Sequence, residues 1–154
     1  MSGYLERSVW STPGLIEKVA AYITWGGRLL VFREPDHPEA GVQVPGGTVE
    51  EGEPLEEAVL REAMEETGLD ELRVKAYLGA GEYDFMDIGY GRFRRHFFHL
   101  EFAGDSPDSW LSFEETPSDG TPGPIRLEFR WVRFTDELPE LAGEQGDFLE
   151  KIIS

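Results

Sequence analysis

The chain has 154 residues, enough for about one domain, and 40% of them are hydrophobic, which excludes an intrinsically disordered protein. The absence of cysteine excludes disulfides, thiolate metal sites and cysteine nucleophiles. There are 31 acidic and 14 basic residues, and the net charge of −17 repels nucleic-acid polymers and anionic membranes at long range. No apolar run is long enough for a signal peptide or a membrane span, so we expect one cytoplasmic domain over residues 1–154.

Alternating hydrophobicity and clusters of turn residues divide the chain into strands, loops and two helices. The first half predicts a β-hairpin at 16–33 that turns at Gly26-Gly27, a loop at 34–40, a short extended stretch at 42–44, a sharp turn at 45–47 and a helix at 54–67. The second half predicts one or two strands at 72–85 with a kink near Gly79, a strand at 93–102, a long loop at 104–124, a strand at 125–134 and a closing helix at 145–153.

The helix expected at 54–67 carries glutamates on a face that should be buried. At about 100° per residue, Glu62 and Glu66 point in the same direction as Leu55, and Glu65 falls within an arc of about 100° with them. Like charges at this spacing destabilise a helix, and burying them costs more, so something must offset the repulsion. A divalent cation is the simplest candidate, and oxygen ligands favour Mg²⁺ or Mn²⁺ over zinc. The alternative is a solvated acidic face.

Residues before and within the helix favour the metal-site interpretation. The turn expected at Pro45-Gly46-Gly47 would direct backbone carbonyls toward the helix. Arg61 lies four residues before Glu65, a spacing at which it pairs with and orients a carboxylate.

The spacing of nine residues in this region resembles the Nudix box, whose pattern is G-x5-E-x7-R-E-U-x-E-E-x-G-U. The pattern covers 23 residues, from 47 to 69, and the opening hairpin and the late Trp131-Val132 strand also resemble the family. The one soft departure is Ala63, where the family prefers a bulkier aliphatic residue, and it concerns packing alone. The matching residues are Gly47, Glu53, Arg61, Glu62, Ala63, Glu65, Glu66, Gly68 and Leu69.

The resemblance implies an α/β protein with the Nudix fold, a mixed β-sheet sandwiched between helices. It also implies hydrolysis of a nucleoside diphosphate linked to another moiety X, with Mg²⁺ or Mn²⁺ as cofactor. For the site, the resemblance implies that the metal ligands are Glu62, Glu65, Glu66 and a backbone carbonyl of Gly46 or Gly47, that Arg61 orients the catalytic carboxylate and that Glu53 supports it.

The general base remains open among several carboxylates. Glu65 or Glu66 is the first choice, because a bound metal lowers the pKa of a water and a nearby carboxylate then removes its proton. The resemblance also allows a base from a later strand or loop, for which Glu128 and the pair Glu114-Glu115 are the candidates. The alternative for each of these three is a surface carboxylate.

The sequence gives weaker evidence for the residues that contact the substrate. Arg92, Arg94 and Arg95 belong to the only basic cluster of an acidic chain, so we expect phosphate contacts there, with a solvated hairpin edge as the alternative. We place Glu128 with these substrate-side residues. Trp110, in the expected loop, suggests a lid or a dimer contact.

The two histidines of the strand expected at 93–102 do not suggest a metal site. His96 and His99 have the wrong parity to face one side of a strand together. The strand phenylalanines are more typical of core packing than of base stacking.

An active hydrolase is the favoured function, because every carboxylate of the box is present. The alternative is a nucleotide-binding sensor or regulatory module without turnover. An isomerase of allylic diphosphates on the same fold would need a cysteine acid, which this chain lacks. The net charge disfavours RNA decapping. We therefore expect a small nucleotide substrate, a homodimer, and no binding to nucleic-acid polymers or membranes. The box does not encode the identity of X.

Overall fold

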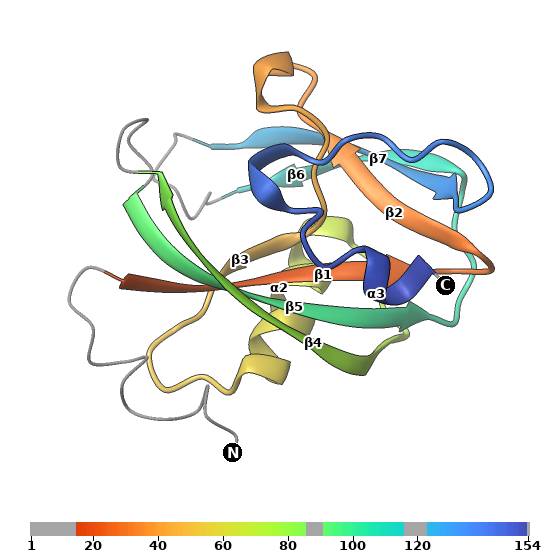
Figure 1. Cartoon of the computed structure of the whole chain (residues 1–154). Coiled ribbons are helices and arrows are strands. Elements are labelled where there is room, and N and C mark those ends of the chain that lie inside the picture. Colours follow the sequence, from red (N-terminus) through yellow and green to blue (C-terminus); the bar gives the residue numbers. More distant parts are fainter. Residues whose placement is uncertain (1–14, 86–90, 116–122, 154) are drawn as a thin grey trace.

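The computed structural model describes residues 15–85, 91–115 and 123–153, and its strands form one mixed sheet (Figure 1). In the described residues this sheet has seven strands in the order β4-β5-β1-β2-β7-β6, with β3 paired to β1. The strands are β1 (Leu15–Thr24), β2 (Arg28–Arg33), β3 (Gly46–Thr48), β4 (Leu72–Phe85), β5 (Gly91–Phe102), β6 (Ser109–Glu114) and β7 (Ile125–Arg133). The helical segments are η2 (Pro38–Ala40), α2 (Leu55–Thr67), η4 (Ala142–Glu144) and α3 (Glu150–Ile153).

Side chains of the central strand β1 alternate between two apolar cores. Val19, Ala21 and Ile23 belong to the core beneath α2, whereas Ala20 and Tyr22 belong to the core beneath the C-terminal segment. Figure 1 shows α2 behind the sheet and the C-terminal segment, with η4 and α3, in front of it. The predicted mixed sheet is confirmed, and β1 pairs in parallel with β5 and antiparallel with β2. The front helical layer is reduced to two short helical segments.

The predicted hairpin at 16–33 is confirmed as β1 and β2. Gly26 and Gly27 both have positive φ angles, 56° and 76°, as a two-residue hairpin turn requires. The backbones of Trp25 and Arg28 close the turn with reciprocal hydrogen bonds of 3.0 and 3.1 Å. The predicted kinked strand at 72–85 is one strand, β4, with irregular pairing to β5 near Gly79.

The predicted helix at 54–67 is confirmed as α2, with one small correction at its start. Pro54 caps the helix with an extended backbone, and the first helical residue is Leu55. Gly68 ends the helix at a φ of 76°, and its N–H donates to the Met64 carbonyl at 3.0 Å. The buried side of α2 holds Glu62 and Glu66 as well as apolar side chains.

Two predicted breaks in the chain are wrong because they contain strands. The sharp turn expected at 45–47 is largely strand β3, which pairs with β1; its glycines serve close packing, since a Cβ on Gly46 would lie 2.3 Å from the Val19 carbonyl oxygen. The loop expected at 104–124 contains β6, which pairs with β7. Flanking glycines and prolines hid the short alternating pattern of β6. Residues 116–122 of that expected loop lie outside the described residues.

The closing helix expected at 145–153 is also wrong for most of its length. The structure has η4 at 142–144, turns at 145–149 and a helix only at Glu150–Ile153. Gly143 has a φ of 60°, outside the helical region, and Gly146 lies within the turns. The segment covers the sheet through Phe148, whose ring lies 4.6 Å from that of Phe97.

Candidate active site

The buried carboxylates of α2 lie directly against the backbone of β3. The Gly46 N–H donates to Glu66 Oε1 at 2.9 Å. A Cβ on Gly47 would lie 2.2 Å from the carboxyl carbon of Glu62, so a side chain at this position would displace that carboxylate. Glu62 and Glu66 are 8% and 7% exposed. The strand backbone and the helix side chains therefore form one surface, and the close approach explains why the sequence places glycines opposite these acids.

Arg61 connects this surface to the loop before the helix. Its guanidinium binds Glu53 with two hydrogen bonds, Nε to Oε2 at 2.8 Å and Nη2 to Oε1 at 2.9 Å. Nη1 donates to Glu62 Oε2 at 2.9 Å and to Glu65 at 3.4 Å, and Nη2 donates to the Thr48 carbonyl at 3.2 Å. The hydrogen bonds to Arg61 hold the pKa of Glu53 below its ordinary value. Arg61 thus fixes the orientation of the Glu62 carboxylate.

We predict that Arg61→Lys lowers turnover about ten- to a hundredfold, because an ammonium group cannot reproduce the paired bonds to Glu53 while holding Glu62. The measurement is kcat with the best substrate found, at saturating divalent metal. Arg73→Lys is the matched control, since Arg73 pairs with Glu101 at the exposed surface, away from α2. Equal turnover of wild type and Arg61→Lys would contradict the orienting role.

A third carboxylate joins the pair from outside the helix. Burial, and after it the nearby Glu114 carboxylate, raise the pKa of Glu66 well above its ordinary value, and Glu66 and Glu114 share a hydrogen bond. Burial also raises the pKa of Glu62, against the opposing effect of Arg61. Glu114 is the last residue of β6. Three carboxylates thus crowd together in a setting that disfavours their negative charge.

This donor set fits a hard divalent cation. Arg61 compensates the charge of Glu62, and a cation bound by carboxylate oxygens would likewise relieve the repulsion between Glu66 and Glu114. Among the described residues, Glu62, Glu66 and Glu114 are near one another, but no group of three or more acidic or histidine side chains is arranged to hold a metal ion. Mg²⁺ usually keeps several waters and takes only one or two protein carboxylates, which agrees with an incomplete set.

The other predicted carboxylates lie at the edge of this cluster or outside it. The side chain of Glu65 is 62% exposed and contacts Arg61. Glu128 pairs with Arg33 across β7 and β2. Glu115 is exposed just after β6. Of the carboxylates outside the box, Glu114 is therefore the one that the structure brings to Glu66; the catalytic roles of all of them stay predictions.

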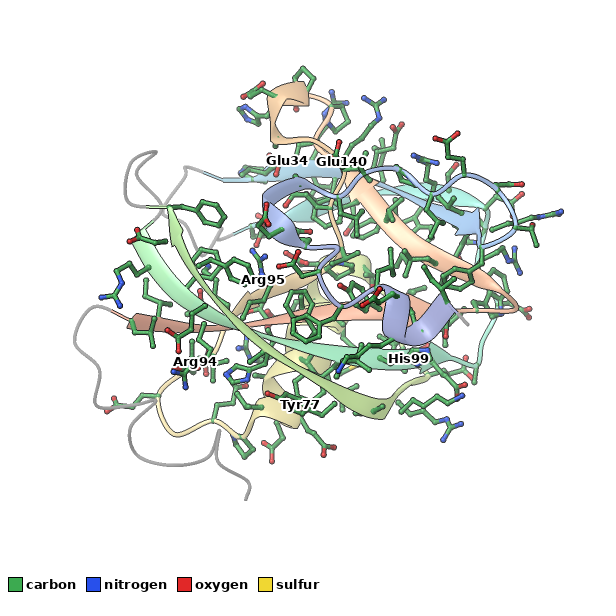
Figure 2. The ribbon with its side chains drawn as sticks, in the orientation of Figure 1. Glu34, Tyr77, Arg94, Arg95, His99 and Glu140 are labelled. Carbon is green, nitrogen blue, oxygen red and sulfur yellow. The ribbon has the colours of Figure 1, made fainter. Side chains whose placement is uncertain are left out.

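The three arginines expected at the substrate do not lie together. Arg94 pairs with Glu82, whereas Arg95 donates to the Gly143 carbonyl at 2.8 Å and lies 4.9 Å from the centre of the Phe93 ring. Successive residues of β5 point to opposite faces, and Figure 2 shows Arg95 beside the C-terminal segment, apart from Arg94. Burial lowers the pKa of Arg95. Arg92 is exposed. Their substrate role stays a prediction, but they cannot act as one cluster.

A buried polar network beneath α2 has no counterpart in the predicted site. His96 Nε2 and Glu17 Oε1 lie 2.7 Å apart, and the Tyr77 hydroxyl lies 3.0 Å from His96 Nδ1. His99 instead bonds Thr24 Oγ1 at 2.8 Å. The two histidines thus have separate partners, and the network links β1, β4 and β5. Only the position of a histidine and a glutamate in apolar strands could have signalled it.

Comparison with known proteins identifies the class to which this fold and site belong. The family model described as NUDIX domain matches residues 16–152, so the chain belongs to the Nudix hydrolase family. A solved MutT NUDIX hydrolase from Burkholderia pseudomallei has the same fold, with a TM-score of 0.63 at 22% identity, over 89% of this chain and 97% of that chain.

Two curated relatives carry pyrophosphohydrolase names. An RNA pyrophosphohydrolase of Wolbachia pipientis subsp. Culex pipiens (strain wPip) is 29% identical over 120 residues, 72% of this chain and 70% of that protein. An ADP-ribose pyrophosphatase of Methanocaldococcus jannaschii is 42% identical over 77 residues, 49% of this chain and 40% of that protein. In the second case the chain spans less than half of its relative. Within the described part of this chain, no helix has the length and apolar character to cross a membrane.

Proposed function

We propose that the protein is a Mg²⁺-dependent Nudix hydrolase that cleaves a phosphoanhydride bond in a nucleoside diphosphate linked to X. The observation that carries this proposal is the burial of Glu62 and Glu66 against the backbone of β3, with Glu114 near Glu66 and with Glu62 oriented by Arg61. Such a cluster suits a metal-assisted reaction of an anionic substrate. The family membership of residues 16–152 supports it independently.

In the proposed reaction, water attacks a phosphorus atom of the anhydride and the bond from that phosphorus to the bridging oxygen breaks. The products are two phosphate esters, and one water is consumed. The metal, when bound, would neutralise the phosphate oxygens and lower the pKa of the attacking water. Glu62 and Glu66 would hold it, with Mn²⁺ as a substitute for Mg²⁺. Glu65, Glu66 or Glu114 would accept the proton of the water, and Arg61 would keep the carboxylates in place.

The identity of X follows from neither the box nor the relatives. Their names differ in substrate, RNA in one and ADP-ribose in the other. The net charge of −17 favours a small nucleotide over an RNA chain.

The test is a hydrolysis panel at millimolar Mg²⁺ with nucleoside triphosphates, ADP-ribose, UDP-sugars, dinucleoside polyphosphates and a 5′-triphosphorylated RNA oligomer. We expect turnover of one class of small nucleotide, abolished by EDTA and restored by Mg²⁺ or Mn²⁺. Turnover of the RNA oligomer alone would overturn the small-nucleotide assignment and keep the reaction. Tight nucleotide binding without turnover, in metal-loaded protein, would overturn the enzyme and favour the sensor.

A further inference from the structure

Strand β6 lies at the edge of the sheet and has one neighbouring strand, β7, in the described fold. Its residues alternate in exposure: Leu111 and Phe113 are exposed, whereas Trp110 and Glu114 point toward α2. The strand that carries Glu114 is therefore held by backbone pairing on one side only. What fixes it relative to α2 is the set of contacts made by its inward side chains.

Trp110 makes the clearest of these contacts. Its indole N–H donates to the Thr67 carbonyl at 2.9 Å. Its ring stacks on Phe129 of β7, with centroids 5.3 Å apart and planes 15° apart. The sequence suggested a lid or a dimer contact for this residue, and the structure instead packs it against the core beneath α2.

The carbonyl that Trp110 binds lies at the end of α2 next to the proposed site. The last carbonyls of a helix have no partner within the helix, so an outside donor both satisfies and fixes them. Thr67 follows Glu66 directly, and Glu114 follows Trp110 by four residues on the same face of β6. The hydrogen bond thus joins the end of the helix that carries Glu66 to the strand that carries Glu114.

We propose that Trp110 is a positioning residue: its indole N–H fixes β6 against the last turn of α2 and so holds Glu114 within reach of Glu66. This inference rests on the proposed function, because it assigns Glu114 a part in the metal-binding cluster. Stacking on Phe129 restricts the indole ring to an orientation in which its N–H donates to the Thr67 carbonyl. The residue acts through Glu114 and does not touch substrate.

The test is Trp110→Phe, which removes the N–H and keeps an aromatic ring on Phe129. The readout is calorimetric Mn²⁺ binding to substrate-free protein, at the site that Glu66→Gln abolishes. We expect about tenfold weaker binding, the lower end of the range for residues that orient metal ligands. Tyr22→Phe is the matched control, because it also removes a side-chain donor to a backbone carbonyl, here that of Gln145 at 2.6 Å, and lies in the core beneath the C-terminal segment. We expect that control to bind Mn²⁺ as wild type does.

A double-mutant cycle with Glu114→Gln separates positioning from general stability. If Trp110 acts through Glu114, Trp110→Phe should weaken Mn²⁺ binding in the wild-type background and have no further effect in the Glu114→Gln background. Equal effects in both backgrounds, wild-type binding by Trp110→Phe, or its failure to fold while Tyr22→Phe folds, would each overturn the proposal. Absence of any Mn²⁺ site in wild type would instead overturn the proposed function.

Discussion

Replacing Glu66 by glutamine is expected to reduce turnover at least about a hundredfold, because the amide keeps the shape of the side chain but not its charge. Its oxygen still accepts the Gly46 N–H, so the contact between α2 and β3 remains. For stability we expect a gain, in contrast to the loss of turnover. Removing one of three crowded carboxylates should raise the free energy of unfolding of the metal-free protein, by on the order of 1 kcal/mol at neutral pH.

Both effects are measured on the same samples: turnover at saturating Mg²⁺, and the free energy of unfolding by urea in EDTA. The matched control is Glu56→Gln, an exposed glutamate in the first turn of the same helix, for which we expect no change in turnover. Wild-type turnover of Glu66→Gln would contradict the assigned site. A large loss of stability in EDTA would show that Glu66 is structural, and that the cluster is not under electrostatic repulsion.

The sequence predicted the helix half of the site well because its signal is local. A spacing of four residues places Glu62 and Glu66 on one face of any helix over this segment, and Leu55 on the same face indicates that it is the buried one. The pairing of Arg61 with nearby carboxylates is equally local. By contrast, β3 was missed because two glycines and a proline indicate a turn, and only the approach of Glu62 to Gly47 shows why glycine is needed in a strand.

Glu114 and the arginines show two different reasons why the sequence predicted the site incompletely. Nothing local connects Glu114 to the box, because its position depends on β6 pairing with β7 across the sheet. The separation of Arg94 from Arg95 was predictable, since adjacent residues of a strand face opposite sides. The same alternation separates His96 from His99. The network of His96 with Glu17 and Tyr77 joins three strands, so no spacing in the sequence could reveal it.

Gly47→Ala is expected to have the second large effect, for a steric reason. The new Cβ would lie 2.2 Å from the carboxyl carbon of Glu62, which Arg61 holds by a 2.9 Å hydrogen bond. Either Glu62 leaves Arg61 or α2 moves away from β3, and both displace the carboxylates. We expect turnover to fall at least about a hundredfold and the free energy of unfolding to fall by about 1–3 kcal/mol, typical of overpacking. Urea unfolding and kcat measure the two effects.

A second substitution, at Glu62, tests whether the clash with its carboxylate causes the loss of stability. In Gly47→Ala, adding Glu62→Ala removes the colliding carboxylate, so stability should return while turnover stays low. Gly46→Ala is the matched variant, because its Cβ would collide with the Val19 carbonyl at 2.3 Å, and Glu62→Ala offers no relief there. Rescue of stability in both double variants, or in neither, would show that the helix and strand do not meet through Glu62. Rescue in the Gly47 variant alone would establish that glycine at this position exists to admit the carboxylate.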